Sequence, residues 1–249
     1  KIEHSEERLD ELRVKETDLL QHIGEMAGKI SEVRQSIGTQ LSKRVINELK
    51  DLRMERAQFE VSIEHIDDPD GCFVGDRRLA FDSTGIDNVE FLLSANPGEP
   101  LRPLAKVASG GEAARIMLSL KRVLTQADQT PTLIFDEVDQ GIGGRIGSVV
   151  GEKLWSLTKG HQVMVVTHLP QLAGFADQHY HVKKVTSANR TITKVNALNN
   201  LDERVIELAE MLGATGDSGK QSAREIIEEA GARKGELSGT LPPKQKSLL

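Results

Sequence analysis

Two short apolar runs, each ending in polar residues, constrain the fold of this chain most strongly. The run 132–135 is followed at once by Asp136 and Glu137, and the run 163–167 is followed by His168. Such runs are typical of strands buried in a parallel sheet. A helical pattern lies between them, so strand, helix and parallel strand are predicted, with helices covering the sheet. Parallel strands end at one edge of a sheet, where α/β proteins place ligands.

The segments around these runs carry helical or hairpin patterns. Apolar side chains recur at helical spacing over 111–127, where Ile116, Leu120, Val123 and Ala127 share a face. Further helices are predicted for 143–157, for a short stretch from Pro170, for 201–212 and for 222–230. Alternation over 178–185 and 190–195 predicts a β-hairpin around 187–189.

The amino-terminal part of the chain has the apolar spacing of a coiled coil. Steps of three and four residues, with one gap at Glu16 and charged residues between, connect Leu9, Leu12, Leu19, Ile23, Met26, Ile30, Val33 and Ile37. The phase slips near Gly38, after which Leu41, Val45 and Leu49 follow in steps of four. We expect this helix to pack on another coiled-coil strand before Gly38 and on a globular head after it. A long surface helix on an ordinary domain is the alternative.

Three regions are predicted along the chain. Residues 1–55 form a coiled-coil arm stub and the helix that enters the head, 56–231 form the head lobe, and 232–249, rich in Gly, Lys, Pro and Ser, form a disordered tail. Within the lobe, alternation predicts strands over 59–63 and 89–93. The run 67–71 is predicted to be a turn that ends the first strand, with a loop or weak hairpin after it.

Composition narrows the class of protein. The 249 residues carry a formal charge of −6, which argues against a uniformly basic nucleic-acid coat but leaves a local basic patch open. The single cysteine, Cys72, excludes an internal disulfide framework and fits a cytoplasmic protein. No apolar run reaches the roughly 18 residues of a membrane span, so no membrane partner is expected. The chain opens at Lys1 inside a helical pattern, and we expect a piece of a longer protein.

The acidic pair after the first run has the chemistry of a hydrolytic site. Asp136 can hold Mg²⁺, which is usually bound by one or two carboxylates together with substrate phosphates. Glu137 can orient or deprotonate an attacking water. A solvated acidic pair at a strand end is the alternative.

Three further features lie close to these runs in the predicted topology. Ser109, Gly110 and Gly111 precede a helix, where a hydroxyl and free amides suit a terminal phosphate; an ordinary loop is the alternative. His168 can contact that phosphate or the attacking water, or be hydrogen-bonded only locally. Asp139 can help to join two protomers, or be a turn aspartate before Gly141. Their joint occurrence in this order favours one nucleotide site.

These residues together resemble the head of ABC-type ATPases of the SMC-like class, most closely a bacterial DNA-repair branch of it. The segment 108–112 is similar to the signature motif, 132–137 to Walker B, 138–144 to the D-loop and its continuation, and 166–171 to the switch-histidine segment. The resemblance implies the carboxy-terminal half of an α/β head with a parallel sheet and flanking helices. It also implies a role in DNA repair and recombination at double-strand breaks after DNA damage. The implied location is the bacterial cytoplasm, in association with the nucleoid.

The same resemblance implies a role for each motif residue. Asp136 is the Mg²⁺-associated carboxylate, Glu137 the general base and His168 the γ-phosphate sensor. The signature residues Ser109, Gly110, Gly111 and Glu112, with Asp139 of the D-loop, cap ATP held by a second head in an ATP-dependent dimer. The implied partners are that second protomer, DNA and the amino-terminal lobe of the same protein.

The sequence departs from the family pattern at two places. Ala113 and Ala114 stand where a Leu-Ser pair is common. The phosphate-binding loop G-x-x-x-x-G-K-[ST] is missing, because 214–222 places alanine and glutamine at required Gly and Ser/Thr positions and follows a predicted helix. We expect that loop in an amino-terminal half and expect this piece alone to be inactive.

Two alternatives and one further site follow from the sequence. The alternatives are a head fragment of another SMC-like or Rad50-like ATPase and a non-catalytic coiled-coil interaction module. The densest basic group of the predicted head is a candidate DNA contact, or else a solvated hairpin face, and comprises Lys183, Lys184, Arg190 and Lys194.

Overall fold

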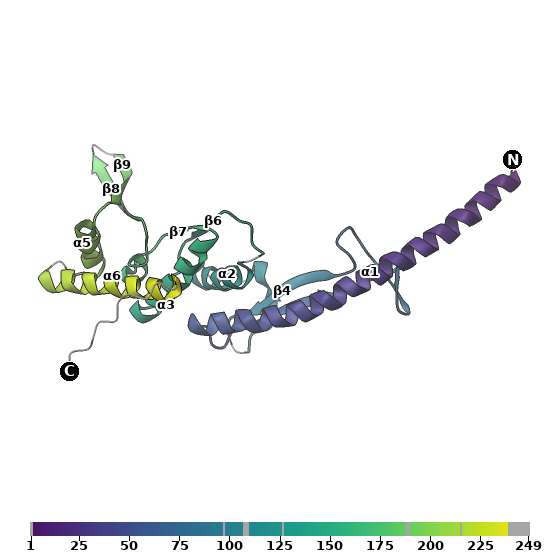
Figure 1. Cartoon of the computed structure of the whole chain (residues 1–249), viewed down its shortest axis with the longest axis horizontal. Coiled ribbons are helices and arrows are strands. Elements are labelled where there is room, and N and C mark those ends of the chain that lie inside the picture. The colour runs from purple at the N-terminus through teal and green to yellow at the C-terminus, as the bar shows by residue number, and fades with distance from the viewer. Residues whose placement is uncertain are drawn as a thin grey trace. The chain divides into compact units, whose positions relative to one another are not determined.

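The computed structural model describes residues 2–96, 98–106, 110–125, 127–187, 190–214 and 216–238. The chain forms two compact units (Figure 1). The first contains 1–47 and 56–107, and the second contains 48–55 and 108–249. The strands between 56 and 107 therefore group with the arm helix, whereas the sequence places them with the head lobe.

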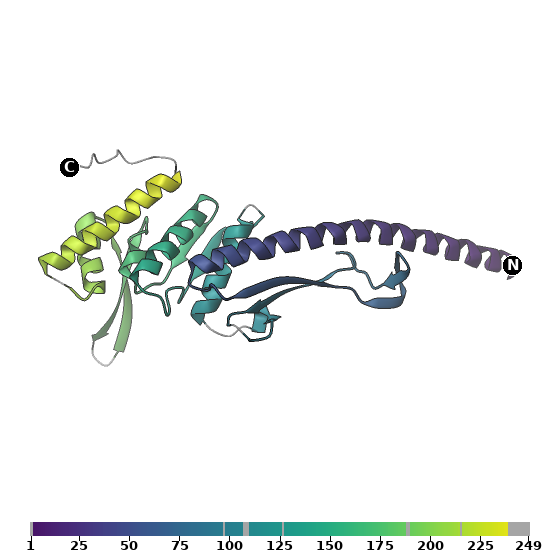
Figure 2. The ribbon, with the colours of Figure 1, turned by 90° about the horizontal axis from the view of Figure 1, so that it is seen from below.

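The first unit combines one long helix with antiparallel strands. Helix α1 (Ile2–Asp51) contributes all but its last residues to this unit. Strand β1 (Gln58–Glu64) pairs with β4 (Asn88–Ser94), from Gln58 opposite Ser94 to Glu64 opposite Asn88, as the alternation of apolar residues predicts. Strand β5 (Arg102–Pro103) pairs with β4 and leads into the 3₁₀ helix η1 (Leu104–Lys106). Figure 2 shows these strands running alongside α1.

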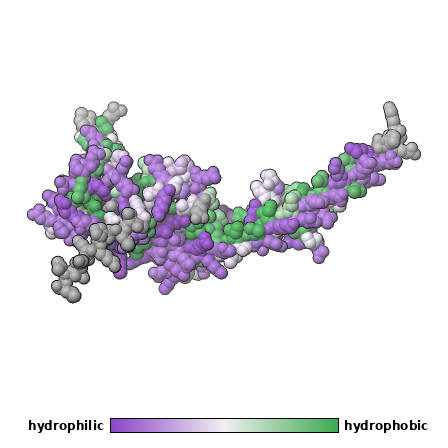
Figure 3. Space-filling model, viewed as in Figure 1, coloured by the Kyte–Doolittle hydropathy of each residue, from purple (hydrophilic) through white to green (hydrophobic). Residues whose placement is uncertain are grey.

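Helix α1 presents an exposed apolar stripe up to Ile37 and buried positions after Gly38. The exposed stripe contains Leu9, Leu12, Leu19, Met26, Ile30, Val33 and Ile37; Figure 3 shows hydrophobic side chains at the surface along the arm. Val45 and Leu49 are fully buried. Most of the predicted stripe is therefore exposed up to Ile37, whereas Ile23 packs on a core cluster of this unit. Pairing of the exposed stripe with a second coiled-coil strand stays a prediction.

A second face of α1, which the heptad analysis missed, packs on the strands through small residues. A Cβ atom on Gly24 would lie 1.8 Å from the carbonyl oxygen of Phe73, and one on Gly38 would lie 3.2 Å from Val61 Cβ. Buried Ala27 lies between these glycines and joins a core cluster with Cys72 and other apolar side chains. Small side chains let helix and strand backbones approach closely.

The predicted turn at 67–71 lies inside a strand, which corrects the sequence analysis. Strand β2 (Asp67–Val74) pairs with β3 (Arg77–Leu79), and its register shifts between Asp67 and Cys72, both of which pair with Leu79. The Asp70 amide donates to Asp68 Oδ1 at 2.9 Å. The residues 67–71 therefore do form a turn-like hydrogen bond, but it produces an irregularity within β2 and does not end the strand.

A buried carboxylate, Asp87, ties α1 to the strands of the same unit. Arg34 donates to Asp87 Oδ2 at 2.7 Å, and His65 Nε2 lies 2.9 Å from Oδ1. Burial by itself would raise the pKa of Asp87, but hydrogen bonds from Ser31, Arg34 and His65 outweigh it and hold the pKa below its usual value. Asp87 is thus a buried, negatively charged residue that links α1 to the strands of this unit.

The second unit is built around two parallel strands. Strand β6 (Thr132–Phe135) pairs with β7 (Gln162–Val165), in register from Thr132 opposite Gln162 to Phe135 opposite Val165. Helix α2 (Gly110–Leu124) precedes β6, and α3 (Gly144–Ser156) with the 3₁₀ helix η2 (Leu157–Lys159) precedes β7. The predicted order of strand, helix and parallel strand is confirmed.

One face of this two-stranded sheet is covered and the other is open. Leu133 and Phe135 lie in a core cluster with apolar side chains of α2 and α3. Ile134 is 70% exposed, and Met164 and Val166 are exposed as well. Strands predicted to be buried on both faces are therefore buried on one face only within this chain.

The helices and strands after β7 begin or end at other residues than predicted. Helix α4 (Pro170–Ala173) starts at its proline, and a hairpin follows with β8 (His179–Ser187) and β9 (Arg190–Leu198). The hairpin tip at 188–189 lies outside the described residues. Helix α5 spans Leu201–Met211 and α6 spans Asp217–Ser238.

Two predicted ends are corrected. Helix α6 continues past 231 to Ser238, because Arg233 pairs with Glu152 of α3 and Lys234 with Asp177; the rest of the predicted tail, 239–249, lies outside the described residues. Helix α2 ends at Leu124, so Ala127 is not on its face, and the Thr125 hydroxyl donates to Lys121 and Arg122 carbonyls at its end.

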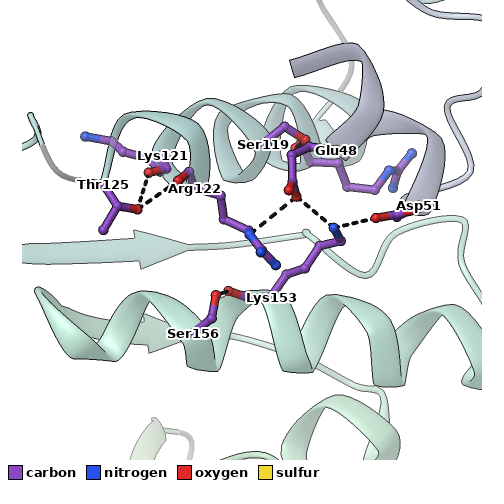
Figure 4. Close-up of polar contacts among 9 residues, drawn as sticks. Glu48, Asp51, Ser119, Lys121, Arg122, Thr125, Lys153 and Ser156 are labelled. Atoms are coloured by element: carbon purple, nitrogen blue, oxygen red, sulfur yellow. Dashed lines mark hydrogen bonds and ion pairs between the residues drawn. The ribbon is translucent and has the colours of Figure 1, made fainter. Parts of the chain in front are cut away.

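The end of α1 is fixed in the second unit by an ionic cluster (Figure 4). Lys153 of α3, 5% exposed, donates to Glu48 Oε2 at 2.7 Å and to Asp51 Oδ2 at 2.8 Å. Arg122 of α2 pairs with the same Glu48 oxygen at 3.3 Å. With buried Leu52 in the core cluster, these charges join the last turn of α1 to α2 and α3.

Candidate nucleotide-hydrolysis site

Three predicted site residues lie at one edge of the β6–β7 sheet. The parallel register sets Phe135 opposite Val165, and the Val166 amide donates to the Phe135 carbonyl at 2.9 Å. Asp136 and Glu137 follow β6 directly, and His168 follows β7 after a short connection. The structure therefore brings together the acidic pair and the histidine.

The backbone at Glu137 turns sharply. Its φ of 56° lies in the left-handed region, which costs about 1–2 kcal/mol for a residue with a side chain. The Glu137 amide donates to Asp136 Oδ1 at 2.9 Å, and the Gln140 amide donates to the Glu137 carbonyl at 3.0 Å. These bonds stabilise the four-residue turn 137–140. The side chain of Glu137, the first residue of this turn, is exposed at the end of β6.

Asp139 fixes the histidine segment of its own chain. The Asp139 carboxylate, 3% exposed, accepts hydrogen bonds through Oδ2 from the Thr167 hydroxyl and from the His168 amide at 2.9 Å. His168 Nδ1 lies 3.2 Å from the same oxygen, while the His168 side chain is 74% exposed. The buried carboxylate thus faces inward to Thr167 and His168 of its own chain.

The predicted signature residues lie at the start of α2. Gly110 and Gly111 open the helix, and Glu112 is half-buried in its first turn; Ser109 lies outside the described residues. A Cβ atom on Gly110 would lie 2.1 Å from Glu137 Oε2. Glycine at this position therefore allows the Glu137 carboxylate to lie against the helix start.

Sequence analysis missed two residues that connect these parts. Gln140 Oε1 accepts a hydrogen bond from the Gly111 amide at 3.1 Å, and the Gln140 carbonyl accepts one from Arg115 at 2.8 Å. Arg115 is 8% exposed, and burial lowers its pKa although the charge of Glu112 partly offsets this. No local pattern links Gln140 to a helix start 29 positions earlier, so only the folded chain shows this contact.

The chemistry of Asp136 fits a magnesium ion held mainly by water and phosphate. Within the described residues no three His, Cys, Asp or Glu side chains gather into a metal cage. Asp136 is exposed and uses Oδ1 for the Glu137 amide, with no described donor on Oδ2. A single available carboxylate is the usual protein contribution to such an ion, so the residues fit the group.

The segment 214–222, which partly resembles a phosphate-binding loop, leads into the start of helix α6 (Asp217–Ser238). Helix α5 ends at Met211, a turn follows, and α6 begins at Asp217, so Gly219 and Lys220 lie in helical backbone. The Lys220 amide donates to the Gly216 carbonyl at 3.1 Å. A phosphate loop leaves a strand, and this segment therefore does not have that structure.

The basic residues of the β8–β9 hairpin are partly on one face. Lys183 lies directly opposite Lys194, whereas Lys184 pairs with Thr193 and points to the other face. Like charges directly opposite one another are unfavourable. The side chain of Arg190 lies outside the described residues.

The order and placement of these parts match an expectation from the sequence. The glycine-led helix α2, the strand β6 that ends before Asp136 and Glu137, buried Asp139 and the strand-end His168 follow one another as expected for the carboxy-terminal half of an SMC-like head. No helix in the described ranges is long and apolar enough to cross a membrane.

Comparison with known proteins identifies the branch. No protein-family profile matches the chain. The DNA repair protein RecN of Streptomyces coelicolor is 40% identical over 84% of this chain and 37% of its own length. RecN of Halalkalibacterium halodurans is 35% identical and that of Bacillus subtilis 33%, each over 92% of this chain and about 40% of the relative. Most of the chain therefore corresponds to a segment of RecN proteins.

A solved structure has a weaker likeness to the chain. An SMC ATPase aligns with a TM-score of 0.42 and 18% identity, over 74% of this chain and 99% of that one. The chain spans about 40% of the length of the RecN relatives.

Proposed function

We propose that this chain supplies one half of an ATP-hydrolysing head of a RecN-type repair protein. In this proposal Asp136 holds Mg²⁺ together with water and phosphate oxygens, Glu137 accepts the proton of the attacking water, and His168 contacts the terminal phosphate. Bound Mg²⁺ would neutralise phosphate charge. The observation that carries the proposal is the β6–β7 register, which sets Glu137 and His168 at one sheet edge.

The start of α2 is proposed to act on nucleotide held by a second head. Unpaired amides at a helix start suit a phosphate, and the charge that develops on the phosphates is stabilised better by two protein faces than by one. ATP binding would then join two heads, and hydrolysis would release them. Ser109, Gly110, Gly111 and Glu112 form the cap in this proposal.

The missing phosphate loop is assigned to an amino-terminal lobe of the same protein. Support comes from the open face of the sheet, where Ile134, Met164 and Val166 are exposed. An apolar sheet face exposed to water is unfavourable, so a second layer is expected there. The exposed stripe of α1 is likewise proposed to pack on the returning coiled-coil strand.

DNA is the proposed partner of the complete protein, in the repair of double-strand breaks. The matched relatives bear the name DNA repair protein, and the basic face of the β8–β9 hairpin, with Lys183 opposite Lys194, offers a contact for phosphates.

Complementation tests the split site. ATP hydrolysis is measured for this chain alone, for the amino-terminal half of the same protein alone, and for their mixture. We expect activity only in the mixture, and a mixture made with Glu137→Gln serves as the matched control. Hydrolysis by this chain alone would mean that it contains its own phosphate loop. Inactivity of both the mixture and the intact protein would favour a non-catalytic interaction module.

A further inference from the structure

The side chain of Gln140 accepts a hydrogen bond from a backbone amide that the proposed function assigns to phosphate. The first amides of a helix have no partner within the helix, and that of Gly111 donates to Gln140 Oε1 at 3.1 Å. The Gln140 carbonyl accepts from Arg115, one turn further along α2, at 2.8 Å. Gln140 therefore holds the helix start at two points, through its side chain and through its backbone.

The contact between Gln140 and the helix start is close. A Cβ atom on Gly111 would lie 2.8 Å from Gln140 Cβ and 3.1 Å from Gln140 Oε1. Arg115 is buried, and its Nε has no hydrogen-bond partner in the described part of the chain. An anion that takes the Gly111 amide as its donor therefore competes with the Gln140 side chain, because an N–H shared between two acceptors gives each a weaker bond than it gives one acceptor alone.

Displacement of the Gln140 side chain would affect Glu137 and His168 through the turn 137–140. The Gln140 amide donates to the Glu137 carbonyl at 3.0 Å, and neighbouring Asp139 holds the His168 amide at 2.9 Å. Glu137 also lies against Gly110, where a Cβ atom would come within 2.1 Å of its Oε2. The helix start and the hydrolytic residues are thus joined by four consecutive residues.

We propose that Gln140 is a positioning residue that competes with the terminal phosphate of a nucleoside triphosphate for the Gly111 amide. While Gln140 holds that amide, the turn 137–140 keeps Glu137 against α2. Occupation of the helix start by phosphate releases the Gln140 side chain, and the turn is then held to α2 only through the Gln140 carbonyl and Arg115. This inference depends on the proposed function, because the ligand is the nucleotide carried by the opposing head.

The test uses the intact protein in a Glu137→Gln background, where the ATP-dependent association of heads is followed by sedimentation as ATP is titrated. Gln140→Ala removes the competing acceptor, and we expect the half-maximal ATP concentration to fall about 2- to 10-fold, the range of a typical hydrogen bond. Gln140→Glu keeps an acceptor and adds negative charge beside the phosphate, so the half-maximal concentration should rise. Gln221→Ala, on exposed α6, is the matched control and should change nothing.

Hydrogen exchange of the peptide that contains Gly111 gives a second reading independent of activity. Without ATP, Gln140→Ala should speed exchange of the Gly111 amide relative to the parent protein, because the amide no longer has its acceptor. Saturating ATP should slow it in both proteins. Faster exchange in the variant without a change in ATP titration would overturn the competition.

The outcomes separate this inference from the proposed function. If Glu137→Gln slows hydrolysis but Gln140→Ala leaves the ATP titration unchanged or shifts it upward, the role of Gln140 is wrong and the hydrolytic assignment stands. If heads fail to associate with ATP in any variant and Glu137→Gln hydrolyses at the full rate, the proposed function itself is wrong. Should Gln140→Ala fail to fold, the upward shift expected for Gln140→Glu still decides the question.

Discussion

The carboxylate of Asp139 and the backbone amide of His168 are joined by a hydrogen bond of 2.9 Å. This bond connects the turn after β6 to the segment after β7, so the ends of the two strands are fixed to one another. Because the Asp139 side chain is buried, the bond is shielded from water and its loss leaves the donor without a partner.

Replacement of Asp139 tests that connection. Asp139→Ala leaves the Thr167 hydroxyl and the His168 amide without their acceptor, and we expect the free energy of unfolding to fall by about 1–3 kcal/mol. Asp139→Asn retains one carbonyl oxygen and should be less destabilising. Urea denaturation of the intact protein measures both, with Asp18→Ala at an exposed position of α1 as the control. Equal stability of all three variants would contradict the assigned role.

Removal of the carboxylate at Glu137 tests the chemistry. In the completed protein, Glu137→Gln is expected to slow ATP hydrolysis by about 10²–10⁴-fold, because the amide cannot accept the proton of the attacking water. Nucleotide binding should stay within a factor of about two. Steady-state hydrolysis and equilibrium binding measure the two effects, and Glu60→Gln on exposed β1 is the control. Full-rate turnover would remove Glu137 from the mechanism.

Two glycines of α1 provide a matched pair for the packing of the arm. A methyl group on Gly24 would lie 1.8 Å from the Phe73 carbonyl oxygen, whereas one on Gly28 would have its nearest neighbour at 3.8 Å. Gly28→Ala should therefore stabilise the helix by about 0.5–1 kcal/mol, since alanine has the better helix propensity. Gly24→Ala should destabilise the protein despite the same gain. Thermal unfolding distinguishes them, and a similar shift for both would show that the close approach at Phe73 is absent.

The buried carboxylate of Asp87 predicts how stability depends on pH. Its pKa is lower in the folded chain than in the unfolded chain, so its contribution is fully present above the unfolded value of about 3.9 and is lost as pH falls through the folded value. The free energy of unfolding should therefore decrease below about pH 4. Asp87→Asn should show a smaller decrease over that range. Urea titrations between neutral and acidic pH measure the difference, and identical pH profiles would exclude Asp87 as the source.

Charge reversal on the hairpin tests its interaction with DNA. Lys183→Glu with Lys194→Glu should reduce the slope of log affinity against log salt by about 0.9 for each phosphate that the hairpin no longer neutralises. Lys220→Glu on α6, a single exposed lysine outside the hairpin, is the control. The measurement is DNA binding by the intact protein at several salt concentrations. A slope unchanged by the double variant would place the DNA-binding surface elsewhere.

Local patterns in the sequence predicted much of the fold and part of the site. The long helix α1 with buried Val45 and Leu49, the two parallel strands and the proline that starts α4 follow from periodicity and backbone chemistry, and the structure confirms them. The strand-end positions of Asp136, Glu137 and His168 follow from the same reasoning.

Predictions failed where a distant partner decides the outcome. The turn chemistry of 67–71 was expected to end a strand, but pairing of both Asp67 and Cys72 with Leu79 keeps it within β2. The end of α6 was missed, since its polar residues are held by ion pairs to Glu152 and Asp177, far away in the sequence.

The sequence by itself determined which residues are candidates for the chemistry and at which strand ends they lie, because side-chain periodicity reports the local backbone and the buried face. The tertiary structure decided which of them touch. That Gln140 occupies the Gly111 amide, that Asp139 holds His168, and that Gly24 admits the Phe73 carbonyl all depend on contacts between distant segments. Such contacts depend on the packing of whole elements, and no local pattern of residue types encodes them.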